Sequence, residues 1–289
     1  MDRGFLSAIE LRTSAGRTYY LVALTVLVFA AVLTLFPFFF AFTSGLKGTT
    51  EIFAAGLNLF PDVPQWQNYA DAWRQFNMPR LFANSFVIVG VGVIFRLIVS
   101  SAAAFSLSKL KPIGGRIITL GFLATLMVPF IAYFVPLFKT LNDVPIVHAN
   151  LLNSYWGLWL PYCVDAFSIF VLKTFIDRIP SDLIDSARVD GATAWQMFWH
   201  IVMPLSRSIV IVVCVLSFVA LWKDFLLPYL VLADPLTQPI TVRLYYLADD
   251  YSVNLQMAAS FIALLPPLLI AILLQRYMKV GLTLGGVKG

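Results

Sequence analysis

Long apolar runs without charged residues alternate along this chain with short polar segments. A helix needs about 20 predominantly apolar residues to cross the hydrocarbon core of a bilayer. The runs are Thr18 to Leu46, Leu81 to Phe95 continuing as Leu97 to Ser108, Ile117 to Phe138, Val144 to Cys163 and beyond, Ser208 to Trp222, and Tyr251 to Gln275. This pattern predicts an all-α, polytopic membrane protein with six transmembrane helices.

The composition excludes an ordinary soluble protein. Hydrophobic residues make up 60% of the 289-residue chain and charged residues only 12%, whereas soluble domains carry about a quarter charged residues. The net charge of +5 does not indicate nucleic-acid binding, because the basic residues flank the predicted spans.

Basic residues are distributed unevenly between the two sides of the predicted membrane. One side has Arg3, Arg12, Arg17, Lys109, Lys111, Arg116, Lys173, Arg178, Arg188, Arg207, Arg276, Lys279 and Lys288, whereas the other has Lys47, Arg74, Arg80, Lys139 and Arg243. The positive-inside rule places the richer side, with both termini, in the cytoplasm. The predicted organisation is a cytoplasmic segment at 1–17 and one transmembrane domain at 18–289, with an external loop at 45–84 and a cytoplasmic loop at 175–207.

The cytoplasmic loop contains the most polar interior segment of the chain. Pro180 and Ser181 favour a helix start, with Ser181 as a cap, and we expect this helix to run to Val189. Asp190 and Gly191 then break it. Thr193 and Gln196 have the spacing of a capping box, which predicts a second helix that ends at Pro204. Two short helices joined at a glycine form a rigid projection that can fit a cleft in another protein.

The residues of this loop resemble the cytoplasmic motif of the membrane subunits of binding-protein-dependent ABC importers. That motif reads Glu-Ala-Ala, then Asp-Gly three residues later, with a proline downstream. The matching positions are Asp185, Ser186, Ala187, Asp190, Gly191, Ala192, Phe198 and Pro204. Two positions depart from the motif, because Asp185 stands for glutamate and Ser186 for alanine. The resemblance implies a type I ABC importer permease fold and assigns these residues to ATPase coupling.

Further matches extend the resemblance over nearly the whole chain. They are Asn68-Tyr69, Asn84-Ser85, Met127-Val128-Pro129, Asn153 to Gly157, and the ending Gly281 to Gly289. The ending is similar to the maltose-type branch of carbohydrate permeases, and in particular to the smaller of its two paired subunits.

The external loop is either an interfacial aromatic belt or part of the face that receives a solute-binding protein.

The resemblance also implies a set of partners and a cellular location. The partners are a second, homologous permease subunit, two ATPase subunits or a homodimer of one, an extracytoplasmic solute-binding protein, and a sugar. ATP and Mg would bind the ATPase subunits, and the complex would lie in a bacterial or archaeal plasma membrane. Two alternatives stay open, an ion-coupled secondary transporter and an ABC permease for a non-sugar solute such as a polyol or glycerol phosphodiester.

Residue patterns for catalysis, metal binding or cofactor binding are missing from this chain. His148 and His200 fall on opposite sides of the predicted membrane, and Cys163 and Cys214 fall in different spans. No Gly-x-x-x-x-Gly-Lys-Ser/Thr motif for ATP occurs. We therefore predict a transport subunit that is not itself an enzyme.

Four charged residues interrupt or close the predicted spans. Arg96 and Asp165 lie deep in different spans, where an uncompensated charge is costly. They either form a compensating pair, contact a partner subunit, or line a polar substrate path. Lys223 and Asp224 close the fifth span and form either an interfacial pair or part of that path. Lys223 departs from the family, which typically has a neutral amide there.

The third span offers candidate path residues of another kind. Met127, Phe130 and Tyr133 are apolar or aromatic, and such residues pack a core or line a cavity. Pro129 and Pro136 free backbone carbonyls from the helix ladder. The possible substrate path therefore comprises Met127, Pro129, Phe130, Tyr133, Asp165, Lys223 and Asp224.

Overall fold

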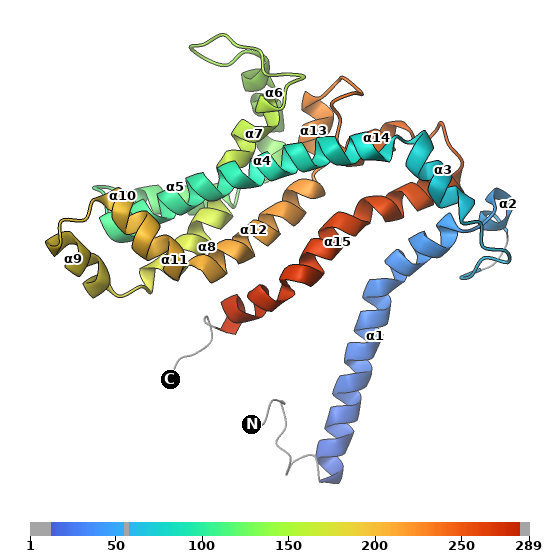
Figure 1. The fold of residues 1–289 in the computed structure, drawn as a ribbon, viewed down its shortest axis with the longest axis horizontal. Helices are drawn as coiled ribbons and strands as arrows, with labels where there is room; N and C mark the ends of the chain where they lie inside the picture. Colours follow the sequence, from blue (N-terminus) through green and yellow to red (C-terminus); the bar gives the residue numbers. More distant parts are fainter. Residues whose placement is uncertain (1–12, 55–57, 284–289) are drawn as a thin grey trace. The chain divides into compact units, whose positions relative to one another are not determined.

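The computed structural model describes the backbone of residues 13–54 and 58–283, with side chains as far as Gln275. Arg3, Arg12 and Lys288 of the predicted basic flank, and most of the Gly281 to Gly289 ending, lie outside these residues. The described residues are mainly helical and form two compact units (Figure 1). One unit contains the residues up to Arg74 together with Asp249–Ile262, and the other contains Gln75–Ala248 and the residues from Ala263 on.

The first unit contains α1 (Ser14–Gly45), α2 (Thr49–Ile52), most of α3 (Gln67–Gln75) and the start of α15 (Val253–Thr283). The Asn68 amide donates to the carbonyls of Gly45 and Lys47, at 3.0 Å each. The Tyr69 hydroxyl donates to the Phe42 carbonyl at 2.8 Å, and burial raises the pKa of this hydroxyl above its usual value. Both side chains therefore tie the external loop to the end of α1.

A glycine allows α1 and α15 to approach closely within this first unit. A Cβ atom at Gly45 would lie 2.9 Å from the Cα atom of Ala258 and 2.8 Å from the Tyr69 hydroxyl oxygen. Real side chains do not come so close, so position 45 requires glycine. Small residues serve the same purpose at helix contacts in many membrane proteins.

The second unit is built around α4 (Met78–Phe105), which continues as a π-helical turn, η2 (Ser106–Leu110). This long helix packs against α7 (Trp156–Cys163), α8 (Ala166–Asp177) and α12 (Arg207–Trp222). Position 92 is again small, because a Cβ atom at Gly92 would lie 3.0 Å from Leu221 and 3.3 Å from Tyr162. The other described helices of this unit are α5 (Gly115–Thr125), α6 (Phe130–Asn142), α9 (Ser181–Val189), α10 (Ala194–Met197), η3 (Phe198–Val202), α11 (Met203–Leu205), α13 (Leu226–Val231), α14 (Ile240–Tyr246) and the part of α15 from Ala263 on.

In the described part of the chain, four helical segments are long and apolar enough to cross a membrane by themselves. They are Ser14–Gly45, Met78–Leu110, Trp156–Asp177 and Val253–Gln275. Two bent pairs raise the number to six if each counts as one span: α5 with α6, bent by 103°, and Ala194–Leu205 with α12, bent by 80°. The predicted six spans therefore require both bent pairs.

Two predicted apolar runs are corrected by the structure. The third run is not one continuous helix, because α5 ends at Thr125 and α6 begins after Pro129. Proline lacks an N–H group and disfavours helical geometry in the preceding residue, so the ladder breaks there. In the fourth run, no helix starts at Val144. That residue pairs with Ala149 in an isolated β-bridge, and the helix begins only at Trp156.

Candidate functional site

The first half of the loop Ser181–Leu205, here called the two-helix loop, ends in a tight left-handed turn. Gly191 has a φ of +79°, a value that favours glycine. Its N–H donates to the Arg188 carbonyl at 3.0 Å, and the Ala192 N–H donates to the Ala187 carbonyl at 2.8 Å. This pair of bonds is the Schellman motif, which satisfies the last carbonyls of α9. The Ala-x-x-x-Gly-Ala spacing is thus the spacing of a helix stop.

The start of α9 differs from the prediction. The N-cap residue is Pro180, and no side chain caps the helix, so the predicted capping by Ser181 is wrong. Ser181 is itself the first helical residue, one position too far along the chain to act as the cap. The acidic residue Asp182 lies in the first turn instead, where a negative charge suits the helix dipole.

The second half of the loop confirms the predicted capping box. The Thr193 hydroxyl accepts from the Gln196 N–H at 3.3 Å, and the Gln196 side chain accepts from the Thr193 N–H at 2.8 Å. The helix then widens into the π-helical turn η3 and ends at Leu205, one residue past Pro204.

The inner face of the two-helix loop is buried in a hydrophobic core. Phe198 is only 6% exposed, and its ring lies 5.5 Å from that of Phe105 on α4. Ile184, Met197 and Val202 are buried in the same core, which also contains residues of α8 and α12. Phe198 was predicted from the motif as a coupling residue, and its side chain faces the membrane helices rather than the outside. It can position the loop but cannot contact a partner directly.

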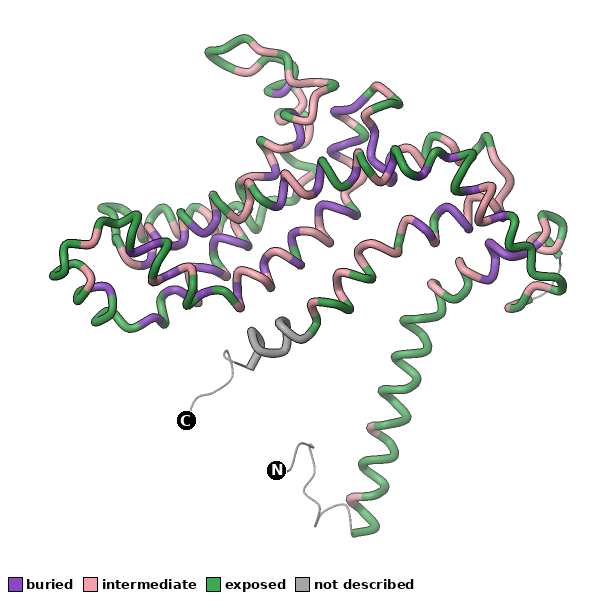
Figure 2. Tube along the Cα trace, viewed as in Figure 1, coloured by how far each residue is buried: buried purple, intermediate pink, exposed green. Residues whose placement is uncertain are grey.

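The outer face of the two-helix loop exposes several large apolar side chains. Val189 is 87% exposed and Trp195 is 69% exposed, and Leu183, Trp199 and Leu205 are also exposed. Figure 2 shows the loop as a mixture of exposed outer and buried inner positions. Exposed apolar side chains on a structured loop are typical of a contact surface. These residues were not predicted as contact residues from the sequence, although apolar positions within a polar segment are a signal for such a surface.

Of the other motif residues, Asp185, Ser186, Asp190 and Pro204 are exposed, whereas Ala187 and Ala192 are half-buried. The Asp185 carboxylate accepts from Arg188 at 3.2 Å, within α9 itself. Because both side chains are largely exposed, this ion pair contributes little to stability. The Asp185 carboxylate therefore stays accessible to a partner.

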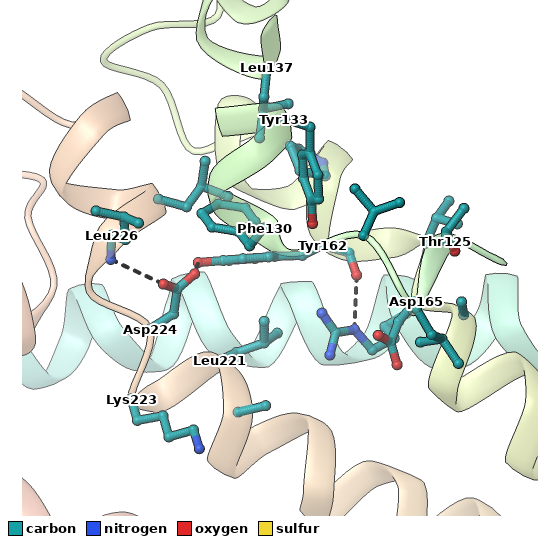
Figure 3. A pocket seen from close by; sticks show the side chains of 18 of the residues that line it. Thr125, Phe130, Tyr133, Leu137, Tyr162, Asp165, Leu221, Lys223, Asp224 and Leu226 are labelled. Atoms are coloured by element: carbon teal, nitrogen blue, oxygen red, sulfur yellow. Dashed lines mark hydrogen bonds between the residues drawn. The ribbon is translucent and has the colours of Figure 1, made fainter. Parts of the chain in front are cut away.

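A cavity of about 960 Å³ lies in the second unit, at three places where one helix ends and the next begins after a short break. The interruptions separate α5 from α6, α7 from α8, and α12 from α13. Figure 3 shows side chains from these breaks around one space. Interrupted helices leave backbone N–H and C=O groups without helical partners. Such backbone occurs at membrane depth only where it is covered by protein or lines a polar cavity.

Tyr162 connects two sides of this cavity. Its hydroxyl donates to Asp224 Oδ2 at 2.6 Å, and its backbone carbonyl accepts from Arg96 Nε at 2.9 Å. Asp224 Oδ1 also accepts from the Leu226 N–H at 3.1 Å, at the start of α13. Both bonds of Asp224 are drawn in Figure 3. The tyrosine thus contacts a basic group on α4 and an acidic group in the break between α12 and α13.

Asp165 has a structural role at the break between α7 and α8. It is the N-cap of α8, and its Oδ2 atom accepts from the Ser168 N–H at 2.9 Å and from the Ser168 hydroxyl at 2.5 Å. The carboxylate therefore meets the positive end of the helix dipole. This arrangement offsets part of the cost of a charge within a span.

Five of the predicted path residues line the cavity together: Phe130, Tyr133, Asp165, Lys223 and Asp224. Arg96 lines it as well. Met127 and Pro129 are not among the lining residues, and Met127 is 85% exposed outside the cavity. Tyr162 was not predicted from the sequence. Its position close before Asp165 in a span was the only signal, and the bond to Asp224 was not visible in it.

The charged residues do not form the ion pairs that were considered from the sequence. Within the described part of the chain, Arg96 forms no ion pair with Asp165, and Lys223 forms none with Asp224. The two carboxylates instead accept from backbone N–H groups at helix starts, Asp165 at the start of α8 and Asp224 at the start of α13. All four residues line the same cavity, as the path interpretation expects, whereas a contact of Arg96 or Asp165 with a partner subunit stays a prediction.

Residues 96–282 match the family described as "Binding-protein-dependent transport system inner membrane component". The chain belongs to this family. The matched range includes the two-helix loop and the cavity, so both features fall within the part that the family shares.

Individual members of the inner-membrane component family are similar over almost the full chain. The lactose transport system permease protein LacG of Rhizobium radiobacter is 35% identical, covering 93% of this chain and 96% of LacG. The arabinooligosaccharides transport system permease protein AraQ of Bacillus subtilis (strain 168) is 32% identical, covering 96% of this chain and 100% of AraQ. The chain is therefore a membrane transport subunit.

The fold of this family member matches a solved structure. A bacterial ABC transporter involved in the import of the acidic polysaccharide alginate has a chain with a TM-score of 0.80 and 20% identity. The alignment covers 92% of this chain and 98% of that chain. The predicted ABC importer permease fold is confirmed.

Proposed function

We propose that this chain is one of two permease subunits that form the path of an ATP-driven importer for a sugar or oligosaccharide. The observation that carries the proposal is the cavity of about 960 Å³ where interrupted helices, aromatic rings and charged groups meet. Its volume is large enough for a small oligosaccharide, because typical small-molecule sites measure about 300–1,000 Å³.

The chemistry of the cavity lining suits a sugar. Rings of Phe130 and Tyr133 lie 5.1 Å apart in an edge-to-face arrangement and offer apolar surface to the faces of a pyranose. The polar groups of Arg96, Lys223 and the helix ends can bond the hydroxyl groups at its rim. The relatives named for lactose and arabinooligosaccharide transport support the same cargo class. A polyol or glycerol phosphodiester is the alternative cargo.

The two-helix loop is the proposed contact with the ATPase subunits. Its exposed apolar face, with Val189 at 87% exposure, would enter a cleft of an ATPase subunit. Its buried face is joined to α4, α8 and α12 through a common core. A displacement of the loop would therefore move these helices, and the cavity that they line, as one body. Asp185, Asp190 and Gly191 would lie at or near the contact.

This assignment implies partners and a location that belong to the proposal. A second permease subunit completes the path, two ATPase subunits hydrolyse ATP with Mg, and a solute-binding protein delivers the cargo from outside. Both termini and the two-helix loop lie in the cytoplasm. The membrane is a bacterial or archaeal plasma membrane.

The test is uptake by the reconstituted complex. The chain is purified with the permease, ATPase and binding proteins encoded beside it, placed in liposomes, and supplied with labelled sugar outside and ATP inside. We expect uptake that requires both ATP and the binding protein. Uptake by this chain alone, driven by a proton or sodium gradient without ATP, would instead establish a secondary transporter.

A further inference from the structure

We infer that the cavity binds an anionic group of the cargo, a carboxylate or a phosphate, between Arg96 and Lys223. This inference rests on the proposed transport function and narrows its substrate class from sugars in general to acidic sugar derivatives. It concerns which hydrogen-bonding groups the cavity leaves available to a solute.

Arg96 has hydrogen-bond donors that are available to a solute inside a membrane span. It lies in the interior of the segment Met78–Leu110, and its Nε atom donates to the Tyr162 carbonyl. Its two terminal nitrogens make no hydrogen bond or ion pair within the described residues. An uncompensated cation at such a depth is costly. A guanidinium fork that is fixed at one nitrogen and open at the other two suits bidentate recognition of a carboxylate or phosphate.

Lys223 provides a second available cation in the same cavity. Its side chain lies at the end of α12, is exposed, and forms no ion pair or hydrogen bond with a described residue. Figure 3 shows Lys223 and Asp224 as neighbours whose side chains point in different directions. The ammonium group is therefore not neutralised by the adjacent carboxylate.

Three of the four carboxylate oxygens of Asp165 and Asp224 are bonded to the protein, and only Asp165 Oδ1 has no bond among the described residues. Asp165 accepts two bonds from Ser168, and Asp224 accepts from Tyr162 and from the Leu226 N–H. The formal charges of the four residues cancel, so long-range attraction is weak. Short-range bonding is asymmetric, because both cations still offer N–H donors while three of the four carboxylate oxygens are engaged. A solute with an acidic group is the one that complements these donors.

The test measures binding to the complete purified permease–ATPase complex by equilibrium dialysis. The probes are galacturonate, glucose 6-phosphate and glucose, each at millimolar concentration, so that carboxylate, phosphate and neutral sugar are compared. At least one anionic probe should bind about tenfold or more tightly than glucose, the difference expected for charge-assisted hydrogen bonds. Which anion binds better distinguishes a uronate from a phosphate cargo.

Variants locate the site within the complex. Arg96→Gln and Lys223→Gln should each abolish most of the preference for the anion, whereas Arg96→Lys should retain part of it. Lys139→Gln is the matched control, because Lys139 is an exposed lysine that does not line the cavity. The control should bind the anion as the unmodified chain does.

Three results would overturn the inference. One is equal or undetectable binding of all three probes, and another is an anion preference that survives Arg96→Gln and Lys223→Gln. The third is loss of the second permease from the complex with Arg96→Gln but not with Arg96→Lys, which would mean that Arg96 answers a carboxylate of that subunit. Since ATP-driven uptake is measured separately, failure here leaves the proposed transport function standing.

Discussion

The two-helix loop and the cavity belong to the same unit of the molecule but use their polar groups in opposite ways. In the loop, the polar backbone groups at the glycine turn and the capping box are bonded to residues three to five positions away. In the cavity, Arg96 and Lys223 keep donors without a partner among the described residues. A part that transmits movement gains from internal bonding, because it must be stiff. A part that binds a solute must leave some hydrogen-bonding groups available to that solute.

The largest expected effect comes from separating the loop from its core. Phe198→Ala removes a buried aromatic ring and leaves a cavity, so we expect a loss of about 3–5 kcal/mol in the free energy of unfolding. Thermal unfolding of the purified complex, followed by intrinsic fluorescence, measures the change. Trp199→Ala is the control, because Trp199 is 45% exposed. Equal destabilisation by both variants would contradict the account of a buried inner face and an exposed outer face.

The next effect concerns the bonded side of the cavity. Tyr162→Phe removes the hydroxyl that donates to Asp224, and an unsatisfied buried acceptor costs about 1–3 kcal/mol. Tyr133→Phe removes a hydroxyl of the same cavity that makes no hydrogen bond within the described residues. Melting temperatures should fall for Tyr162→Phe and stay nearly unchanged for Tyr133→Phe. If the order were reversed, the Tyr162–Asp224 bond would not be the structural tie described here.

A smaller effect on stability should accompany a clear effect on coupling at Gly191. A Cβ atom there meets nothing within 4 Å, so a substitution acts through the backbone and the contact surface, not through a clash inside this chain. Valine resists the left-handed conformation and should cost about 1–2 kcal/mol. Asparagine tolerates it. Aspartate also tolerates it but adds a charge to the outer face.

Comparing these three variants separates strain from contact at Gly191. We expect Gly191→Val and Gly191→Asp to reduce ATP-driven uptake strongly while the subunit remains inserted, and Gly191→Asn to retain most of the uptake. Uptake and ATPase activity are measured on the same proteoliposomes. Unchanged uptake in both the valine and the aspartate variants would remove the role of this turn in coupling.

The smallest effect is expected at Asp185. Because its pair with Arg188 is exposed, Asp185→Ala should change stability by about 0–1 kcal/mol. Any loss of uptake or of co-purification with the ATPase would then report on a contact with the partner. Asp185→Lys adds repulsion from Arg188 and from a basic partner group and should be worse. Normal assembly and uptake in both variants would make Asp185 an ordinary exposed residue.

The difference between the two regions also explains what could be predicted from the sequence. The glycine turn and the Thr193–Gln196 box depend on residues a few positions apart, so local rules predicted them correctly. The error at Ser181 was one of register by a single residue. That Phe198 points inward depends on Phe105, which is far away in the sequence, and no local pattern reveals it.

Several residues that line the cavity were predicted from their type, but the hydrogen bonds that connect them were not. Charged residues are rare within apolar runs, so the four that interrupt or close such runs could be identified as candidates directly: Arg96, Asp165, Lys223 and Asp224. Their hydrogen-bond partners were not accessible in the same way, because the bond from Tyr162 to Asp224 joins residues 62 positions apart. The break before Phe130 was indicated by Pro129, yet the 103° bend that brings Phe130 and Tyr133 to the cavity depends on packing.

Site-directed cross-linking shows whether the outer face of the two-helix loop contacts the ATPase subunit. Val189→Cys, in a chain whose Cys163 and Cys214 are replaced by alanine, is treated with a short bis-maleimide in the assembled complex. Ile146→Cys serves as the control, because Ile146 is 97% exposed but lies in a different loop, outside the two-helix loop. We expect a cross-link to the ATPase subunit from position 189 and none from position 146. A cross-link from 146 only, or from neither position in a complex that hydrolyses ATP and transports, would contradict it.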